Sequence, residues 1–125
     1  AFDLADEDHA REPLPPARAA AFLANPAVCF WVAFDGDRPV GELYCLVVPL
    51  AWDAGAELLL YAVGVDEEYR RKGVGRALSE TMDAFMAAHD LALVWVLADN
   101  PGAVAYYEAM GFSVADEQPS YMMRG

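Results

Sequence analysis

Half of this protein's positive charge lies in one short stretch that also contains two glycines. The chain has eight Lys and Arg residues against twenty Asp and Glu residues, and four of the eight cations fall within residues 70–76. This turn follows an apolar run, 58–65, and precedes a helical pattern of apolar residues. The first N–H groups of a helix attract anions, and Gly73 and Gly75 would let a ligand approach the backbone closely. We therefore predict that the turn binds phosphate.

Two other interpretations of the basic turn stay open. A solvated loop in front of a helix would also contain charges and glycines, and the glycines alone do not distinguish it from a phosphate site. A dinucleotide-binding fingerprint would use the same two glycines. That match is poor, because Leu78 occupies the third glycine position and the first glycine, Gly73, comes eight positions after Val65.

A second candidate site is the stretch 100–112, NPGAVAYYEAMGF. Asn100 followed by proline is typical of a helix start, and Gly111 is typical of a helix end. The helix between them contains two adjacent tyrosines, Tyr106 and Tyr107, whose side chains point about 100° apart. Tyr106 is expected to pack, and a core role is one interpretation of Tyr107 as well.

Together, the two stretches resemble the GNAT superfamily of N-acetyltransferases. Arg70, Gly73 and Gly75 match its pyrophosphate loop, Arg/Gln-x-x-Gly-x-Gly/Ala. The second signature, Asn-x-x-Ala-x-x-x-Tyr-x-x-x-Gly-Phe, is matched by Asn100, Ala103, Tyr107, Gly111 and Phe112. The resemblance covers roughly residues 15–125.

The resemblance implies acetyl-CoA as the cofactor. The backbone of one strand would bind the pantetheine arm and the basic turn would bind the diphosphate. The cofactor-binding residues that the resemblance implies are Val63, Val65, Arg70, Arg71, Lys72, Gly73, Val74, Gly75, Arg76, Asn100, Ala103 and Tyr107.

The implied reaction is direct attack of a substrate amine on the thioester. By the resemblance, Tyr107 would donate a proton or hydrogen bond to the leaving sulfur. The amine must lose a proton, which costs roughly 4 kcal/mol at pH 7 for a pKa of ~10. Glu57 and Asp99 are the candidate bases. Strand alternation would put Glu57 on one face with Leu59, Tyr61 and Val63. For Asp99 helix capping is an equal alternative, and Glu57 could be an edge charge.

Within the superfamily the chain looks most like the aminoglycoside 3-N-acetyltransferases, which implies a role in antibiotic resistance. The likeness rests on residues 48–50 and on the spacing from Glu57 to Tyr61, and it departs at Ala62, where those enzymes tend to have an acidic residue. The candidate substrate-binding residues are Asp53, Glu57, Tyr61 and Asp99, with Asp116 and Glu117 as a further acidic rim. Alternatives are a protein, peptide or other small amine as acceptor, or an acyl-CoA sensor without turnover.

The pattern of elements predicts an α+β fold. By the resemblance it is a GNAT fold, a mixed and mostly antiparallel sheet splayed between the fourth and fifth strands and flanked by helices. Strands are predicted at 28–34, 40–48, 58–65 and 91–98, with a closing hairpin of 112–114 and 121–123. The Asp-Gly pair at 35–36 predicts a hairpin between the first two strands. Helices are predicted at 17–23, from Gly73 to about Asp90, and after Asn100. The chain begins without Met, and the family's first strand is expected to be missing or displaced within 1–12.

Length and composition exclude several classes of protein. We expect 1–125 to be a single domain. The net charge of -12 argues against nucleic acid and favours a cationic small-molecule amine as partner, and an acidic surface that only keeps the protein soluble is an equal alternative. With no leader and no membrane-spanning run, we expect a cytoplasmic protein. Cys29 and Cys45 are expected to be reduced core residues, and His9 and His89 have no neighbours at metal-ligand spacing, so no metal is expected. The family includes many dimers, which leaves a homodimer open.

Overall fold

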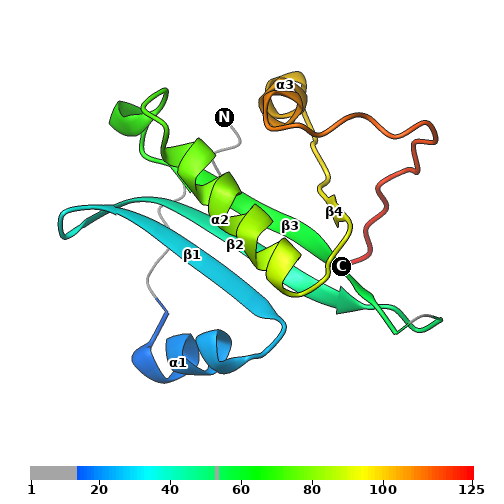
Figure 1. Ribbon diagram of the computed structural model, residues 1–125, viewed down its shortest axis with the longest axis horizontal. Coiled ribbons are helices and arrows are strands. Elements are labelled where there is room, and N and C mark those ends of the chain that lie inside the picture. Colours follow the sequence, from blue (N-terminus) through cyan, green and yellow to red (C-terminus); the bar gives the residue numbers. More distant parts are fainter. Residues whose placement is uncertain (1–13, 53) are drawn as a thin grey trace.

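The computed structural model describes residues 14–52 and 54–125 (Figure 1). A four-stranded sheet in the order β1-β2-β3-β4 forms its centre. The strands are β1 (Val28–Asp35), β2 (Arg38–Pro49), β3 (Ala56–Val65) and β4 (Val94–Trp95). The helices are α1 (Pro16–Ala24), α2 (Val74–Ala88) and α3 (Pro101–Ala109), and a short 3-10 turn, η2 (Glu67–Tyr69), precedes α2.

The sheet is mixed and mostly antiparallel, as predicted. β1 pairs with β2 and β2 with β3 in antiparallel register, whereas β3 and β4 are parallel. The parallel pair extends over only two residues of each strand, so the predicted splay lies between β3 and β4 in this chain. The expected location of the family's first strand lies outside the described residues.

Helix α2 covers one face of the sheet (Figure 1). Its apolar stripe follows the predicted helical spacing, and Leu78 and Met82 are buried against the sheet. Phe85 adds an edge-to-face contact with Trp31 of β1, at 5.5 Å between ring centroids. The core beneath α2 also contains both cysteines, which are buried and free, as expected.

Helix α1 packs on the opposite face of the sheet. Phe22 contacts Phe30 of β1 and Tyr44 of β2, with ring centroids 5.9 and 5.2 Å apart. The prediction of a short helix before Asn25 is therefore confirmed. In the part of the chain that the structure describes, no helix is both long enough and apolar enough to cross a membrane.

Strand β3 contains a bulge that corrects one prediction. Tyr44 pairs with Ala62 and Cys45 pairs with Leu60, so Tyr61 is an extra residue on β3. The extra residue reverses the alternation beyond it. Leu58, Leu60 and Val63 are therefore all buried. Simple alternation would have put Val63 on the face of Glu57, and that expectation is wrong.

Two predicted strand regions are shorter or absent. The strand predicted at 91–98 is reduced to Val94–Trp95, because its chain diverges from β3 after the pair Leu59 and Trp95. The closing hairpin predicted at 112–114 and 121–123 is not formed, and both segments are irregular and largely exposed. Residues with strand propensity do not form a strand without a partner edge.

Candidate functional site

The basic turn predicted to bind phosphate forms one wall of a cavity of about 530 Å³. The cavity lies where the end of β3, the start of α2 and the start of α3 come together. Its lining residues are Val65, Tyr69, Arg70, Arg71, Gly73, Gly75, Arg76, Gly102 and Tyr106. Five of the seven predicted turn residues therefore lie on one concave surface.

The turn presents the open end of a helix to this cavity. Gly73 is the N-cap residue of α2 and has a left-handed backbone, with φ of 87°. No side chain within the described part of the chain makes a capping hydrogen bond there. The first N–H groups of α2 and the guanidinium groups of Arg71 and Arg76 therefore favour an anion in the cavity.

Arg70 connects the turn to the central strand. Its Nε donates a hydrogen bond to the carbonyl oxygen of Val65, the last residue of β3, at 3.2 Å. The side chain is partly buried and lines the cavity. Its position thus depends on the end of β3, and it fixes the first residue of the turn relative to the sheet.

The two remaining turn residues have other contacts. Val74 packs on the sheet, where a Cβ at Gly41 would lie only 2.7 Å from its Cγ1 atom. Lys72 Nζ lies 5.4 Å from the ring centroid of Tyr69. Neither residue lines the cavity, so their direct binding of cofactor stays a prediction.

Gly75 has a packing role that its spacing did not predict. A Cβ atom at this position would lie 2.8 Å from the hydroxyl oxygen of Tyr106. Burial raises the pKa of the Tyr106 hydroxyl. Tyr106 packs against the core, as expected, and it also lines the cavity. Gly75 thus lets α3 approach the start of α2.

Sequence reasoning missed three residues of the cavity wall: Tyr69, Gly102 and Tyr106. Gly102 and Tyr106 are four positions apart, so they share one face of α3. That spacing was visible in the sequence, but only the tertiary structure shows that this face is turned toward α2. Tyr69 precedes the turn directly, and no motif distinguishes its role.

Strand β3 offers an open edge next to the cavity. β4 pairs with β3 only as far as Leu59, and no other strand in the described ranges pairs with this edge from Leu60 to Val65. The side chains of Val63 and Val65 are buried, so only their backbone is available to a ligand at this edge. Backbone binding by these two residues stays a prediction, and an extended ligand chain could pair here as a strand would.

Asn100 and Ala103 form the N-cap of α3. The side-chain oxygen of Asn100 accepts a hydrogen bond from the Ala103 N–H at 2.8 Å, which confirms the predicted cap. The far end of the helix is closed by hydrogen bonds from the N–H groups of Gly111 and Phe112. Neither Asn100 nor Ala103 lines the cavity, so their predicted cofactor contact is not tested.

Tyr107 is buried in the core and does not line the large cavity. Its ring contacts Phe112 at 5.5 Å between centroids and borders a smaller cavity of about 90 Å³. Burial, with smaller effects from Tyr106, Asp99 and Cys45, raises the pKa of Tyr107 to about 12. The hydroxyl therefore keeps its proton at neutral pH and is able to donate it in a hydrogen bond.

The predicted acidic residues do not form one cluster with the basic turn. Glu57 lies near the start of β3, roughly 26 Å along the strand from Val65 at ~3.3 Å per residue. Asp99 is exposed and accepts a hydrogen bond from the Asn100 side chain at 3.1 Å. Tyr61 is 65% exposed and touches Tyr44, with ring centroids 5.2 Å apart.

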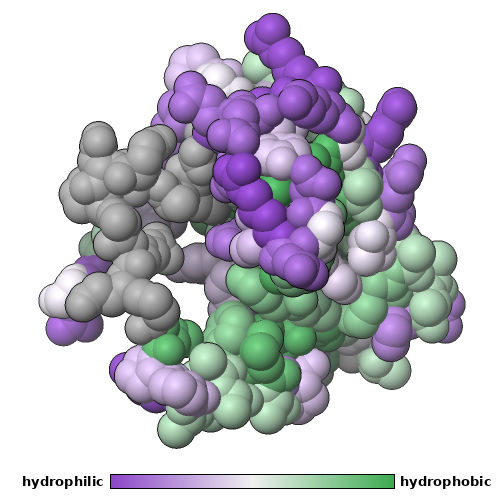
Figure 2. Space-filling view, turned by 90° about the vertical axis from the view of Figure 1, so that its left-hand side faces the viewer, coloured by the Kyte–Doolittle hydropathy of each residue, from purple (hydrophilic) through white to green (hydrophobic). Residues whose placement is uncertain are grey.

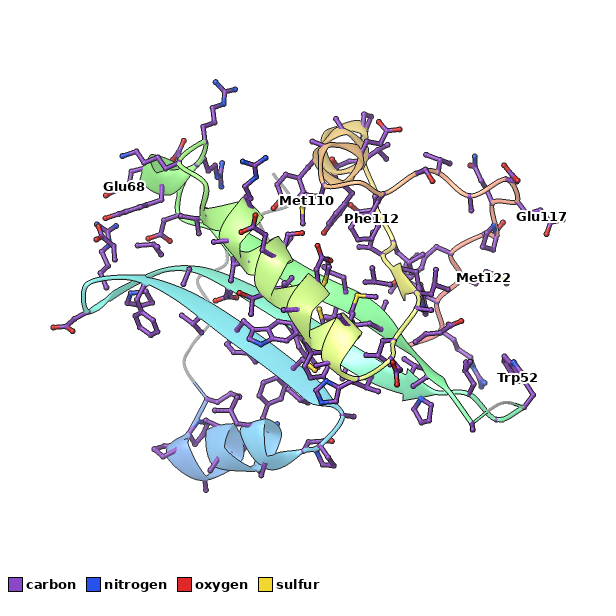
Figure 3. The ribbon with its side chains drawn as sticks, viewed as in Figure 1. Trp52, Glu68, Met110, Phe112, Glu117 and Met122 are labelled. Carbon is purple, nitrogen blue, oxygen red and sulfur yellow. The ribbon has the colours of Figure 1, made fainter. Side chains whose placement is uncertain are left out.

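The remaining candidates for acceptor binding lie at the periphery or outside the described residues. Asp53 lies outside them. Asp116 and Glu117 are exposed on the C-terminal segment. Figure 3 shows Glu117 at the end of the molecule opposite Glu68, which lies beside the basic turn. The acidic rim expected around a substrate cleft stays a prediction.

Comparison with known proteins bears on this arrangement. The sequence model of the family described as Acetyltransferase (GNAT) family matches residues 2–112. A mycothiol acetyltransferase of Kocuria rhizophila is 40% identical over 80 residues, which cover 62% of this chain and 26% of that protein. A ribosomal protein bS18-alanine N-acetyltransferase of Escherichia coli K12 is 37% identical over 67 residues, 52% of this chain and 45% of that protein.

The fold has close structural counterparts. The crystal structure of an aminoglycoside acetyltransferase from an uncultured soil metagenomic sample, in complex with sisomicin, superposes with a TM-score of 0.84 and 20% identity. The match covers 95% of this chain and 79% of that one. At this identity the likeness concerns the fold alone. The chain spans between a quarter and a half of the length of the curated relatives described above.

Proposed function

Because the chain belongs to the GNAT acetyltransferase family, we propose that it is an N-acetyltransferase that transfers an acetyl group from acetyl-CoA directly to a primary amine. Acetyl-CoA supplies the activated thioester, and members of the family use it as the acetyl donor. The observation that carries the proposal is the cavity of about 530 Å³ at the basic turn, next to the open edge of β3.

The residues of the cavity fit the chemistry of a diphosphate. The cavity combines the guanidinium groups of Arg70, Arg71 and Arg76 with the uncapped first turn of α2, which favours an anion. The open edge from Leu60 to Val65 begins beside this cavity and would orient an extended arm along β3. Both features would hold acetyl-CoA in a fixed position. Positioning two reactants correctly can lower the activation barrier by about 7–11 kcal/mol.

Tyr107 is our candidate for the proton donor to the leaving sulfur. Asp99 and Cys45 influence its pKa, and Cys45 pairs with Leu60 in the middle of β3. A thioester held along β3 would then end close to this hydroxyl. As the N–C bond forms and the C–S bond breaks, the Tyr107 hydroxyl would stabilise the sulfur, and the departing ammonium proton would pass to solvent or a carboxylate.

For the base we propose Asp99 or Glu57, each acting directly or through water. Asp99 directly precedes the N-cap of α3 and influences the pKa of Tyr107. Glu57 lies near the far end of β3, on the side where an acceptor would enter. Replacing each carboxylate by its amide tests the assignment. Only the replacement of the true base should make the rate at saturating acceptor less dependent on pH.

For the acceptor we propose a cationic small molecule, with an aminoglycoside amine at the 3-N position as the first candidate. The net charge of -12 would attract such a substrate. A related fold has been crystallised with sisomicin. A role in antibiotic resistance and a cytoplasmic location would follow from this proposal.

A second candidate acceptor is the N-terminal amine of a protein or peptide. It is favoured by the 37% identity to the ribosomal protein bS18-alanine N-acetyltransferase. Asp99, Asp116 and Glu117 are exposed, which suits recognition of a protein surface more than a deep pocket. Cofactor and Tyr107 would have the same roles with either acceptor.

The test is release of free CoA from acetyl-CoA, followed with a thiol reagent across aminoglycosides, polyamines, amino acids and peptides that begin with alanine. Turnover with aminoglycosides supports the first acceptor, and turnover with peptides alone supports the second. Tyr107→Phe should lower kcat with little change in the affinity for CoA. Binding of CoA without release by any amine would contradict the enzymatic proposal and favour an acyl-CoA sensor.

A further inference from the structure

Tyr69 joins the basic turn to a distant hairpin. It is the last residue of η2, directly precedes Arg70, and lines the large cavity. Its hydroxyl donates a hydrogen bond to the carboxylate of Asp35, at the end of β1, with an oxygen–oxygen distance of 2.5 Å. A contact between residues 34 positions apart therefore lies immediately beside the turn.

Arg38, at the start of β2, makes a second connection to the same region. Its guanidinium forms ion pairs with Glu68 at 2.9 Å and with Asp66 at 3.3 Å. It also lies over the ring of Tyr69, 5.2 Å from the centroid, and Lys72 lies 5.4 Å from the same ring. We call this set of residues the hairpin clasp: Asp35, Arg38, Asp66, Glu68, Tyr69 and Lys72.

Hydrophilic side chains gather at this end of the molecule, where the hairpin tip and the turn lie together (Figure 2). The side chain of Arg38 is 51% exposed and that of Glu68 is 65% exposed. Exposed ion pairs contribute little to the stability of a fold. Stability alone is therefore a weak explanation for several polar contacts converging beside the cavity.

The charges of the hairpin clasp suggest a role in the binding of an anion at the basic turn. Asp66 and Glu68 lie directly before the turn, and their negative charge would weaken the binding of an anion there. Arg38 is paired with both carboxylates and thereby offsets their field. Asp35 in turn accepts from Tyr69, which holds the residue before Arg70 in place.

We propose that Arg38, Asp35 and Tyr69 are positioning residues for the cofactor. The hairpin tip fixes the shape of the basic turn and screens the carboxylates of Asp66 and Glu68 from the bound diphosphate. The inference rests on the proposed function, in which the turn binds the diphosphate of acetyl-CoA. None of the three residues belongs to the pyrophosphate-loop signature.

The test is the dissociation constant of CoA, measured by calorimetry at low ionic strength. Arg38→Gln should weaken binding roughly three- to fivefold, the change expected for an exposed charge interaction. Arg18→Gln, which removes the same charge from α1, should leave the affinity unchanged. Glu68→Gln in the Arg38→Gln background should restore part of the loss, because it removes one of the two carboxylates left unpaired.

Pantetheine, which lacks the diphosphate, separates positioning from folding. Arg38→Gln and Tyr69→Phe should weaken the binding of CoA but not of pantetheine, and a thermal melt of each variant shows whether the fold is retained. Equal losses for both ligands, or no rescue by Glu68→Gln, would overturn the proposal. If the unmodified chain does not bind CoA, that result overturns the proposed function, and the inference that rests on it is overturned as well.

Discussion

Tyr106 and Tyr107 are adjacent on α3 but face different parts of the molecule. Tyr106 reaches the start of α2, where its hydroxyl occupies the space left by Gly75. Tyr107 packs against Phe112 in the core, toward the middle of β3. One helix therefore contributes both to the cavity wall at the turn and to the region where we place the thioester.

Gly75→Ala tests the contact between α2 and Tyr106. The added Cβ would lie 2.8 Å from the Tyr106 hydroxyl, so the Tyr106 ring or the start of α2 must shift. We expect the affinity for CoA to fall about tenfold, or ~1.4 kcal/mol. The matched control is Tyr106→Phe, after which the nearest remaining ring atom would be Cζ, at 3.8 Å. The double variant should regain affinity. Without that recovery, Gly75 serves direct access of the phosphate to the backbone instead.

The raised pKa of Tyr107 predicts a loss of stability at alkaline pH. Its pKa is about 12 in the folded chain and ~10 in an unfolded one, so the unfolded state releases the proton first as the pH rises. The contribution is fully present below pH ~10 and is lost as the pH rises to 12, by about 2–3 kcal/mol.

Denaturant unfolding of the unmodified chain and of Tyr107→Phe, at pH 9 and again near pH 11.5, measures this loss. Tyr106 and the cysteines also titrate in the range, but both variants retain them. The free energy of unfolding should therefore fall more steeply in the unmodified chain. Parallel curves would mean that the Tyr107 hydroxyl ionises as freely in the folded state as in the unfolded one.

At the scale of elements, the bulge at Tyr61 decides where β3 leaves β4. Pairing between the two strands ends at Leu59, two positions before the bulge. A bulge bends its strand and increases the local twist, so it turns the rest of β3 away from β4. We infer that the open edge next to the cavity follows from this bend.

Deletion of Tyr61 tests the role of the bulge. Because the extra residue is removed, Leu58, Leu60 and the later Val63 keep their positions on the core face, and the fold should persist. The straightened strand should close the edge, and we expect at least roughly tenfold weaker binding of CoA. Tyr61→Ala is the control, since it removes the ring and keeps the bulge. Similar affinities in the two variants would separate the bulge from cofactor binding.

At the scale of the whole molecule, charge is distributed unevenly. The net charge is -12, yet four of the eight cations lie between Arg70 and Arg76. An anionic ligand therefore meets a local positive turn, whereas a cationic ligand is attracted by the remaining surface. An anionic acetyl donor and a cationic acetyl acceptor would therefore bind to different regions, the donor at the basic turn and the acceptor at the acidic surface.

Salt should distinguish these acceptors. For a polycationic aminoglycoside, kcat/KM should fall about three- to tenfold between low and ~0.3 M salt, because screening removes the long-range attraction. A neutral peptide with one N-terminal amine should show a smaller fall in the same assay with saturating acetyl-CoA. Equal salt dependence for the two acceptors would argue against steering by the acidic surface.

The sequence by itself determined the features that depend on neighbouring residues. The Asp-Gly hairpin, the cap at Asn100, the end of α3 at Gly111 and the basic turn all formed as predicted, because backbone geometry and local hydrogen bonds fix them. The two motifs were also enough to indicate the family. Short-range rules therefore located the candidate site.

Only the tertiary structure decided features that depend on distant partners. The bulge at Tyr61 appears in the register between β2 and β3, and the Tyr106 contact requires α3 to lie against α2. The segments 112–114 and 121–123 have strand-forming residues but no edge to pair with, so their propensity did not decide their structure. Arg38 and Tyr69 meet for the same reason: the antiparallel pairing of β1, β2 and β3 places a hairpin tip beside the end of β3, and no local pattern records it.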